Sequence, residues 1–407
     1  MTDRQALLAA IRAQPDEDTP RLAFADWLDE QGDPFFAHWA TLIRVQIDAA
    51  AQERFSPRWL ELAAEQKRLF AARPKEWTLA WESRLGAMAY RRGFREAAAL
   101  DPDTFPVSFD RVFGSNPIRA VSMNLARAAR KAPIAEYPGL AFVETLDLFE
   151  NGTVTAPRFL RRAAEGMPRL RALGLARMEL STSQVDDVLA IPGLQRLEAL
   201  DLSGNPLFRS VTHGRPETLF RGPAMERARW LDLADTCPSA EALHSLARSP
   251  RLKNLKFLNL SRAAPSNPEM PTFGSAGTYL LTLGHALRGV EYLDLSGQEI
   301  GTSGVRHLLD AGLLENVREL ILVNNGIDDD GAVALADSPQ LARLRRLELG
   351  RNPVTDAGRL ALLGSPHLTN MTVLDGATTT EEARAALPRV GGDPFVSDSH
   401  ALFAPCP

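Results

Sequence analysis

The strongest pattern in the chain is an alternation of leucine with other residues that recurs at regular intervals between residues 143 and 376. Nine segments share the template L-x-x-L-x-L-x-x-N, and their central apolar positions lie 27, 27, 31, 27, 35, 27, 27 and 24 residues apart. Alternating apolar residues place their side chains on one face of a β-strand. The pattern therefore predicts a repeat array in which each unit begins with a strand. The segments span residues 143–151, 170–178, 197–205, 228–236, 255–263, 290–298, 317–325, 344–352 and 368–376.

The stretches between these strands carry apolar residues at helical spacing, for example Val333 and Leu341 in one unit. Thr302, Asp329 and Asp356 stand where such stretches begin, and we expect them to cap the first helical turn. A strand and a helix within 27 residues make a right-handed βα unit. Strands lie about 4.8 Å apart and helices about 10 Å apart, so stacked units must curve. The sequence thus predicts an α/β solenoid with parallel strands on the concave face and helices on the convex face.

The repeat resembles the leucine-rich repeat of the ribonuclease-inhibitor-like class, over roughly residues 117–388. The resemblance implies a horseshoe. The chain departs from the family pattern at the last template position, where asparagine normally bonds turn backbone. Asparagine stands there in four units, at Asn151, Asn205, Asn325 and Asn352. The other units have Met178, Thr236, Ala263, Gln298 and Gly376, which predicts turns that are looser or differently bonded.

The N-terminal part of the chain reads as four helices, over residues 3–13, 20–30, 35–53 and 57–72. The segment 15–34 resembles the bacterial repeat-companion domain, a small domain that precedes repeat arrays. The matching residues are Pro15, Asp16, Asp18, Pro20, Arg21, Leu22, Ala25, Asp26, Trp27, Leu28, Gly32 and Asp33. We therefore expect a small all-helical repeat-companion domain over 1–75, a solenoid cap over 76–116, leucine-rich repeats with a C-terminal cap helix over 117–388, and a tail over 389–407.

Three arginines, Arg91, Arg92 and Arg95, cluster in the predicted cap. They form either a basic binding patch or a solvated face of the cap, and a solvated face is the simpler interpretation. The acidic residues between 16 and 33 lack the alternating ligand positions and central glycine of a calcium loop. No metal site is expected there.

Composition excludes several classes of protein. The chain of 407 residues has 46 basic and 51 acidic residues, a net charge of −5 that gives no nucleic-acid footprint. Two distant cysteines, Cys237 and Cys406, cannot make a disulfide framework, and no stretch reads as a signal peptide or membrane span. We expect a cytoplasmic protein that binds neither nucleic acid nor membrane.

The search for catalytic motifs is negative. The sequence contains no phosphate-binding loop, no dinucleotide fingerprint and no nucleophile elbow, and its seven histidines form no metal motif. These observations predict a protein that is not an enzyme and needs no cofactor. A pocket that clusters carboxylates with histidine would be the sign of an enzyme assembled in space.

The outward positions of successive strands form columns on the predicted concave face. Trp230, Phe257 and Tyr292 occupy one column in three consecutive units. The next column is largely acidic and includes Asp201, Asp232, Asn259, Asp294 and, further along, Glu348. Clustered aromatic side chains are typical of binding hot spots, and carboxylates favour a basic partner. For the acidic column a second interpretation stays open, in which each Asp bonds only local backbone.

Together these features predict a non-catalytic protein-interaction module, acting as an adaptor, sensor or inhibitor. The concave face would bind a protein or peptide that carries Arg or Lys near an apolar side chain. The alternative is a regulator of an enzyme, similar to the GTPase-activating leucine-rich repeat proteins.

Overall fold

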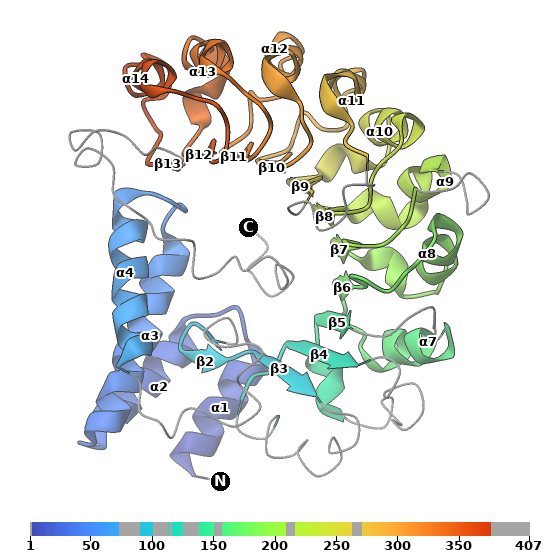
Figure 1. Ribbon diagram of the computed structural model, residues 1–407. Coiled ribbons are helices and arrows are strands. Elements are labelled where there is room, and N and C mark those ends of the chain that lie inside the picture. The colour runs from blue at the N-terminus through green and yellow to red at the C-terminus, as the bar shows by residue number, and fades with distance from the viewer. Residues whose placement is uncertain are drawn as a thin grey trace.

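The computed structural model describes residues 2–72, 90–100, 113, 116–124, 138–149, 157–208, 216–262 and 271–375. Within these ranges eleven strands form one sheet whose spatial order follows the chain from β3 to β13. Figure 1 shows the sheet lining the inside of an arc, with helices outside it. The strands are β3 (Ala97–Leu100), β4 (Ala120–Asn124), β5 (Thr145–Phe149), β6 (Ala172–Gly174), β7 (Ala199–Asp201), β8 (Trp230–Asp232), β9 (Phe257–Asn259), β10 (Tyr292–Asp294), β11 (Glu319–Ile321), β12 (Arg346–Glu348) and β13 (Val373–Asp375).

Every neighbouring pair of strands in this sheet is parallel and keeps the register of the repeat. Leu231 lies beside Leu200 on one side and Leu258 on the other, and all three are buried in the main core. A fixed register places equivalent residues of successive units side by side. The expected α/β solenoid is therefore confirmed.

The helices outside the sheet bury their apolar side chains against the strands. Val305 and Leu308 of α12, for example, are fully buried in the core that the strand leucines form. The α-helices on this side are α7 (Pro157–Gly166), α8 (Thr182–Leu189), α9 (Pro216–Arg221), α10 (Ala240–Ala247), α11 (Gly274–Thr282), α12 (Gly301–Asp310), α13 (Asp329–Ala336) and α14 (Asp356–Leu363).

The helix-start residues act differently from the expectation. The caps of α13 and α14 are Asp328 and Thr355, one residue before the predicted Asp329 and Asp356. Asp329 instead accepts hydrogen bonds from the Thr355 backbone amide, at 2.7 Å, and from its hydroxyl, at 2.5 Å. Thr302 likewise donates to Asp328 in the next unit, at 2.5 Å. Asp329 and Thr302 therefore join neighbouring repeats instead of capping their own helices.

The turn asparagines also join neighbouring units. Asn325 is buried, and its Oδ1 accepts from the amide of Gln298 at 3.0 Å while its Nδ2 donates to the carbonyl of Leu295 at 3.0 Å. Where asparagine is missing, other side chains bond backbone. Thr236 donates to Leu233 at 2.6 Å, and Gln298 reaches Leu260 at 2.5 Å. These two turns are differently bonded, as the sequence suggested.

The N-terminal residues 2–72, here the helical unit, lie across the open side of the arc (Figure 1). Their helices are α1 (Asp3–Ala13), α2 (Thr19–Glu30), α3 (Pro34–Ala51) and α4 (Pro57–Ala71). All four were expected. Three of their ends differ from the prediction by one residue. The largest difference is the end of α3, which stops two residues before Glu53, where Gln52 adopts extended backbone. Residues 52–56 consequently form a loop between α3 and α4.

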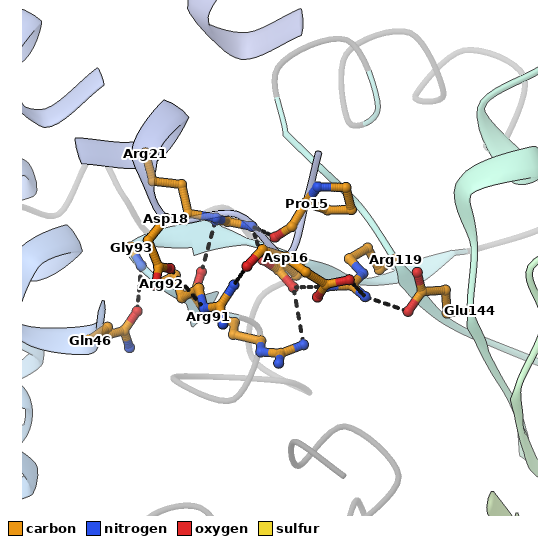
Figure 2. A network of polar contacts seen from close by, with 11 residues as sticks. Pro15, Asp16, Asp18, Arg21, Gln46, Arg91, Arg92, Gly93, Arg119 and Glu144 are labelled. Carbon is orange, nitrogen blue, oxygen red and sulfur yellow. Dashed lines mark hydrogen bonds and ion pairs between the residues drawn. The ribbon is translucent and has the colours of Figure 1, made fainter. Parts of the chain in front are cut away.

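The helical unit is held to the first strands by a buried polar network, here the anchor (Figure 2). Arg21 is fully buried and pairs with Glu96 at 2.5 Å, and it also donates to the carbonyl of Pro15 at 2.7 Å. Arg119, just before β4, pairs with Asp16 at 2.8 Å. Pro15, Asp16 and Arg21, which are among the residues that resemble the repeat-companion domain, thus lie where the helical unit contacts the repeats.

The hairpin of β1 (Tyr90–Arg91) and β2 (Phe94–Arg95) provides the other half of the anchor. Gly93, with φ +79°, donates to Gln46 and accepts from the Trp39 indole, both at 2.6 Å. A Cβ on Gly93 would lie 2.6 Å from the Cα of Ile43, so only glycine fits between hairpin and helix.

The cap arginines do not form one solvated face. Arg92 contacts Asp18 at 3.3 Å, and Arg95 is buried, whereas the Arg91 side chain is 37% exposed and lies 3.9 Å from Glu96. Arg92 therefore belongs to the contact between the helical unit and the solenoid.

Several expectations fall outside the described ranges. These are the tail 389–407, the cap helix at 378–387, most of the cap segment 76–116, and the residues Asn151, Ala263, Gly376 and Cys406. Within the described ranges, no helix has the length and apolar character needed to cross a membrane.

Candidate functional site

Three aromatic side chains, here the aromatic ladder, stack on consecutive strands of the sheet. Trp230 pairs with Phe257 in register, and Phe257 pairs with Tyr292. The ring centroids of Trp230 and Phe257 lie 4.6 Å apart at 16°, and those of Phe257 and Tyr292 lie 4.1 Å apart at 13°. Such near-parallel stacking follows from the strand spacing of about 4.8 Å, which is close to the centroid separation of offset-stacked rings.

The aromatic ladder lies on the opposite face of the sheet from the main core. The residues that follow its members, Leu231, Leu258 and Leu293, are buried in that core. Trp230 instead forms a separate cluster with two alanines of β6 and β7, and Phe257 packs against this cluster. Trp230 is 5% exposed, and Phe257 and Tyr292 are half-buried. The structure therefore brings the three predicted aromatic residues together on the concave face.

The polar column, made of Asp201, Asp232, Asn259 and Asp294, runs beside the ladder on β7 to β10. Each member accepts a hydrogen bond from the backbone amide two residues later. The distances are 2.9 Å at Asp201, 2.9 Å at Asp232, 2.9 Å at Asn259 and 2.8 Å at Asp294. The interpretation that these side chains bond local backbone is thus correct for one oxygen of each. The second oxygen of Asp232 accepts from Asn259 at 3.1 Å.

Burial sets the electrostatics of the polar column. Desolvation raises the pKa of Asp232 well above its ordinary value, and the neighbouring charge of Asp201 acts in the same direction. Burial, reinforced by the charge of Asp294, also raises the pKa of the Tyr292 hydroxyl. A cationic group placed between these carboxylates would favour their charged forms.

Glu348 does not join the other predicted site residues. Ile321 separates it from Asp294 in the register of the sheet. Its carboxylate accepts from Arg346, at 2.8 Å to Nε, and this guanidinium also pairs with Glu319 at 3.5 Å. Glu348 belongs to a second charged group at the C-terminal end of the sheet.

That second group holds residues that sequence reasoning missed. Glu53 and Arg54 of the helical unit pair with side chains next to and on β11 and β12, and Phe55 is buried against them. The available signal was weak. An acid, a base and an aromatic stand together just before Ser56 and Pro57, which begin a helix, and this triplet alone does not indicate what it contacts.

The expectation that the chain is not an enzyme turns on the metal-binding and acid–base groups among the described residues. Among the described residues, no group of three or more His, Cys, Asp or Glu side chains could hold a metal ion. A hollow of about 790 Å³ on the convex side brings Glu217 and Glu241 near His244. Hydrogen bonds from its own amide and from Ser239 lower the pKa of Glu241, which is the opposite of what a general acid requires.

Comparison with known proteins agrees with the repeat. Residues 314–336 and 343–363 match the family model described as Leucine Rich repeat. No curated protein matches the chain.

Three of the solved structures that the chain resembles come from two bacteria. Internalin C2 of Listeria monocytogenes is 20% identical, covers 61% of this chain and 88% of its own, and has a TM-score of 0.35. Internalin InlF of the same species is 14% identical over 65% and 68%, with a TM-score of 0.32. A Bacteroides fragilis protein is 15% identical over 80% and 85%, with a TM-score of 0.38. The register of the strands and the matched segments together show that this chain carries leucine-rich repeats on an α/β solenoid.

Proposed function

We propose that the chain is a non-catalytic protein-interaction module that binds a protein or peptide segment on its concave face. The observation that carries the proposal is the stacked aromatic ladder beside the polar column. Aromatic side chains supply large contact area at little entropic cost, and they are enriched where binding energy concentrates. The half-buried edges of Phe257 and Tyr292 are the part of the ladder that a partner would contact.

The partner's chemistry follows from the two columns. A guanidinium or ammonium group would pair with the carboxylates of Asp232 and Asp294, and an adjacent apolar side chain would cover the rings. The proposed ligand is therefore a segment in which Arg or Lys stands next to an apolar residue. The setting we propose is the cytoplasm, since the sequence has only two cysteines. No residue favours the alternative of a GTPase activator.

The test is selection of peptides from a random displayed library on the immobilised chain. We expect enrichment of Arg or Lys beside an apolar residue, and at least a tenfold loss of binding when Trp230, Phe257 and Tyr292 are all changed to Ala. The matched control is Tyr279→Ala, which removes a half-exposed aromatic side chain from α11. If the selected peptides bind the triple variant as tightly as the unchanged chain, the aromatic ladder is not the binding site.

A further inference from the structure

The loop 52–56 reaches across the opening of the arc and contacts the last strands of the sheet. The hydroxyl of Thr372 donates to the carbonyl of Phe55 at 2.7 Å, although 317 positions separate the two residues. The Phe55 side chain is 1% exposed. This loop is the point at which the helical unit meets the C-terminal end of the solenoid.

The charges of the loop alternate, and the solenoid presents the opposite charges. Glu53 accepts from Arg318 at 3.1 Å and from Arg345 Nε at 2.8 Å. Arg54 pairs with Glu319 at 3.2 Å. Each charge of the loop is thus met by a complementary charge on the strand ends.

The aromatic ring of Phe55 is covered by cations. The guanidinium of Arg54 lies 4.9 Å from the ring centroid, and that of Arg346 lies 5.4 Å from it. Guanidinium groups at this range attract the face of an aromatic ring. Phe55 also adopts φ 60°, a left-handed conformation that non-glycine residues seldom take and that tertiary contacts must hold in place.

The loop side of these ion pairs is open to water, and the solenoid side is only partly so. The side chains of Glu53, Arg54 and Arg318 are 46%, 41% and 43% exposed, whereas those of Arg345 and Glu319 are 18% and 10% exposed. Exposed charges contribute little to stability and are weakened by salt. The contact therefore combines one buried ring with ion pairs that water reaches from the loop side.

We propose that these strand ends form a seat for an acid–base–aromatic segment, and that the chain's own loop is its occupant, so that the helical unit is a releasable latch closing the arc. The seat consists of Arg318, Glu319, Arg345, Arg346 and Thr372. The anchor stays in place when the latch opens. The inference is independent of the proposed function, because opening of the arc is measured without any partner.

The experiment measures the distance across the latch by pulsed electron paramagnetic resonance in the full chain. Spin labels are attached at Lys67→Cys on α4 and Leu360→Cys on α14, both exposed positions, after both native cysteines are changed to Ser. We expect one narrow distance at low salt. Phe55→Ala and Glu53→Arg should each broaden the distribution toward longer distances. Gln52→Ala, a loop change whose side chain bonds Asp48 within the helical unit, should leave it unchanged.

Exchanging the charges of the two sides distinguishes loss of the latch contact from a general destabilisation of the fold. Combining Glu53→Arg with Arg318→Glu and Arg345→Glu reverses both sides of the contact, so the narrow distance should return. Distances that stay narrow in Phe55→Ala and Glu53→Arg would overturn the proposal. Distances that broaden in Glu53→Arg and are not restored by the charge exchange would overturn it as well.

Discussion

The helical unit touches the solenoid at both ends, and the two contacts are built differently. At the anchor, Arg21 and Glu96 are 0% and 8% exposed, and a cluster of aromatic rings that includes Phe24, Trp39 and Phe94 surrounds them. At the latch, Glu53 is 46% exposed, its partners Arg318 and Arg345 are 43% and 18% exposed, and a single ring is buried. Similar charged residues therefore make a permanent contact at the anchor, where water is excluded, and a reversible contact at the latch, where water has access.

The largest effect should come from removing one partner of the anchor. Arg21→Met leaves Glu96 buried without its nearest cation, and breaking a buried pair in this way costs about 3–5 kcal/mol of unfolding free energy. Urea denaturation of the full chain measures it. The control is Arg44→Met, which breaks exposed pairs with Asp26 and Asp29 and should cost less than about 1 kcal/mol. Equal losses in the two variants would contradict the contrast between the contacts.

Asp147 is a buried carboxylate with no arginine partner among the described residues, and it can be compared with Glu96, which is buried beside Arg21. Asp147 on β5 is buried and accepts from the Ser122 hydroxyl at 3.0 Å, and burial raises its pKa to about 6. Below about pH 4 the group is protonated in both folded and unfolded chains. Between about pH 4 and 6 the folded chain binds more protons, so stability falls as pH rises, by about 3 kcal/mol in total.

Asp147→Asn removes this ionisation and keeps an acceptor for Ser122. We expect the variant to be more stable than the unchanged chain at pH 7.5, by about 2–3 kcal/mol, and the difference to vanish near pH 4. Urea denaturation across this pH range is the measurement, with the exposed Asp310→Asn as control. A difference that is independent of pH would contradict the raised pKa.

The smallest effect should come from the latch charges. Glu53→Gln removes exposed ion pairs with Arg318 and Arg345, so it should lower the unfolding free energy by less than about 1 kcal/mol. Repeating the denaturation in 1 M salt should erase the difference, because the Debye length falls to about 3 Å. A loss as large as that of Arg21→Met would mean that the latch is as permanent as the anchor.

The repeat could be predicted from the sequence because each unit carries its own pattern of leucines within a short segment. Strand register follows from the leucine template, which aligns successive units even where the step is 35 residues instead of 27. The neighbours of Phe257 in the sheet were therefore predictable, and the structure places Trp230 and Tyr292 there. The four N-terminal helices were predictable for the same reason. Their starts carry caps and prolines, for example Ser56 before Pro57.

The anchor and the latch could not be predicted from the sequence, because each joins residues that are far apart in the chain and belong to no common repeat. Arg92 and Arg95 have the appearance of surface residues in sequence, but Arg92 pairs with Asp18 at the start of α2, and Arg95 is buried. The misplaced end of α3 has the same origin. Glu53 favours a helix by local propensity, but in the structure it lies in the loop, where it pairs with Arg345.

The contact between Phe55 and Thr372 changes the topology of a repeat protein. A stack of repeats is ordinarily linear, and each unit contacts only its immediate neighbours. The units at its two ends therefore unfold first. Here the helical unit, which is anchored to the first strands through Arg21 and Glu96, also contacts the residue just before β13, so the two described ends of the stack form a circuit. The entropy of closing so long a circuit grows only with the logarithm of its length. Once it is closed, fraying at either terminus is resisted by contacts made at the other.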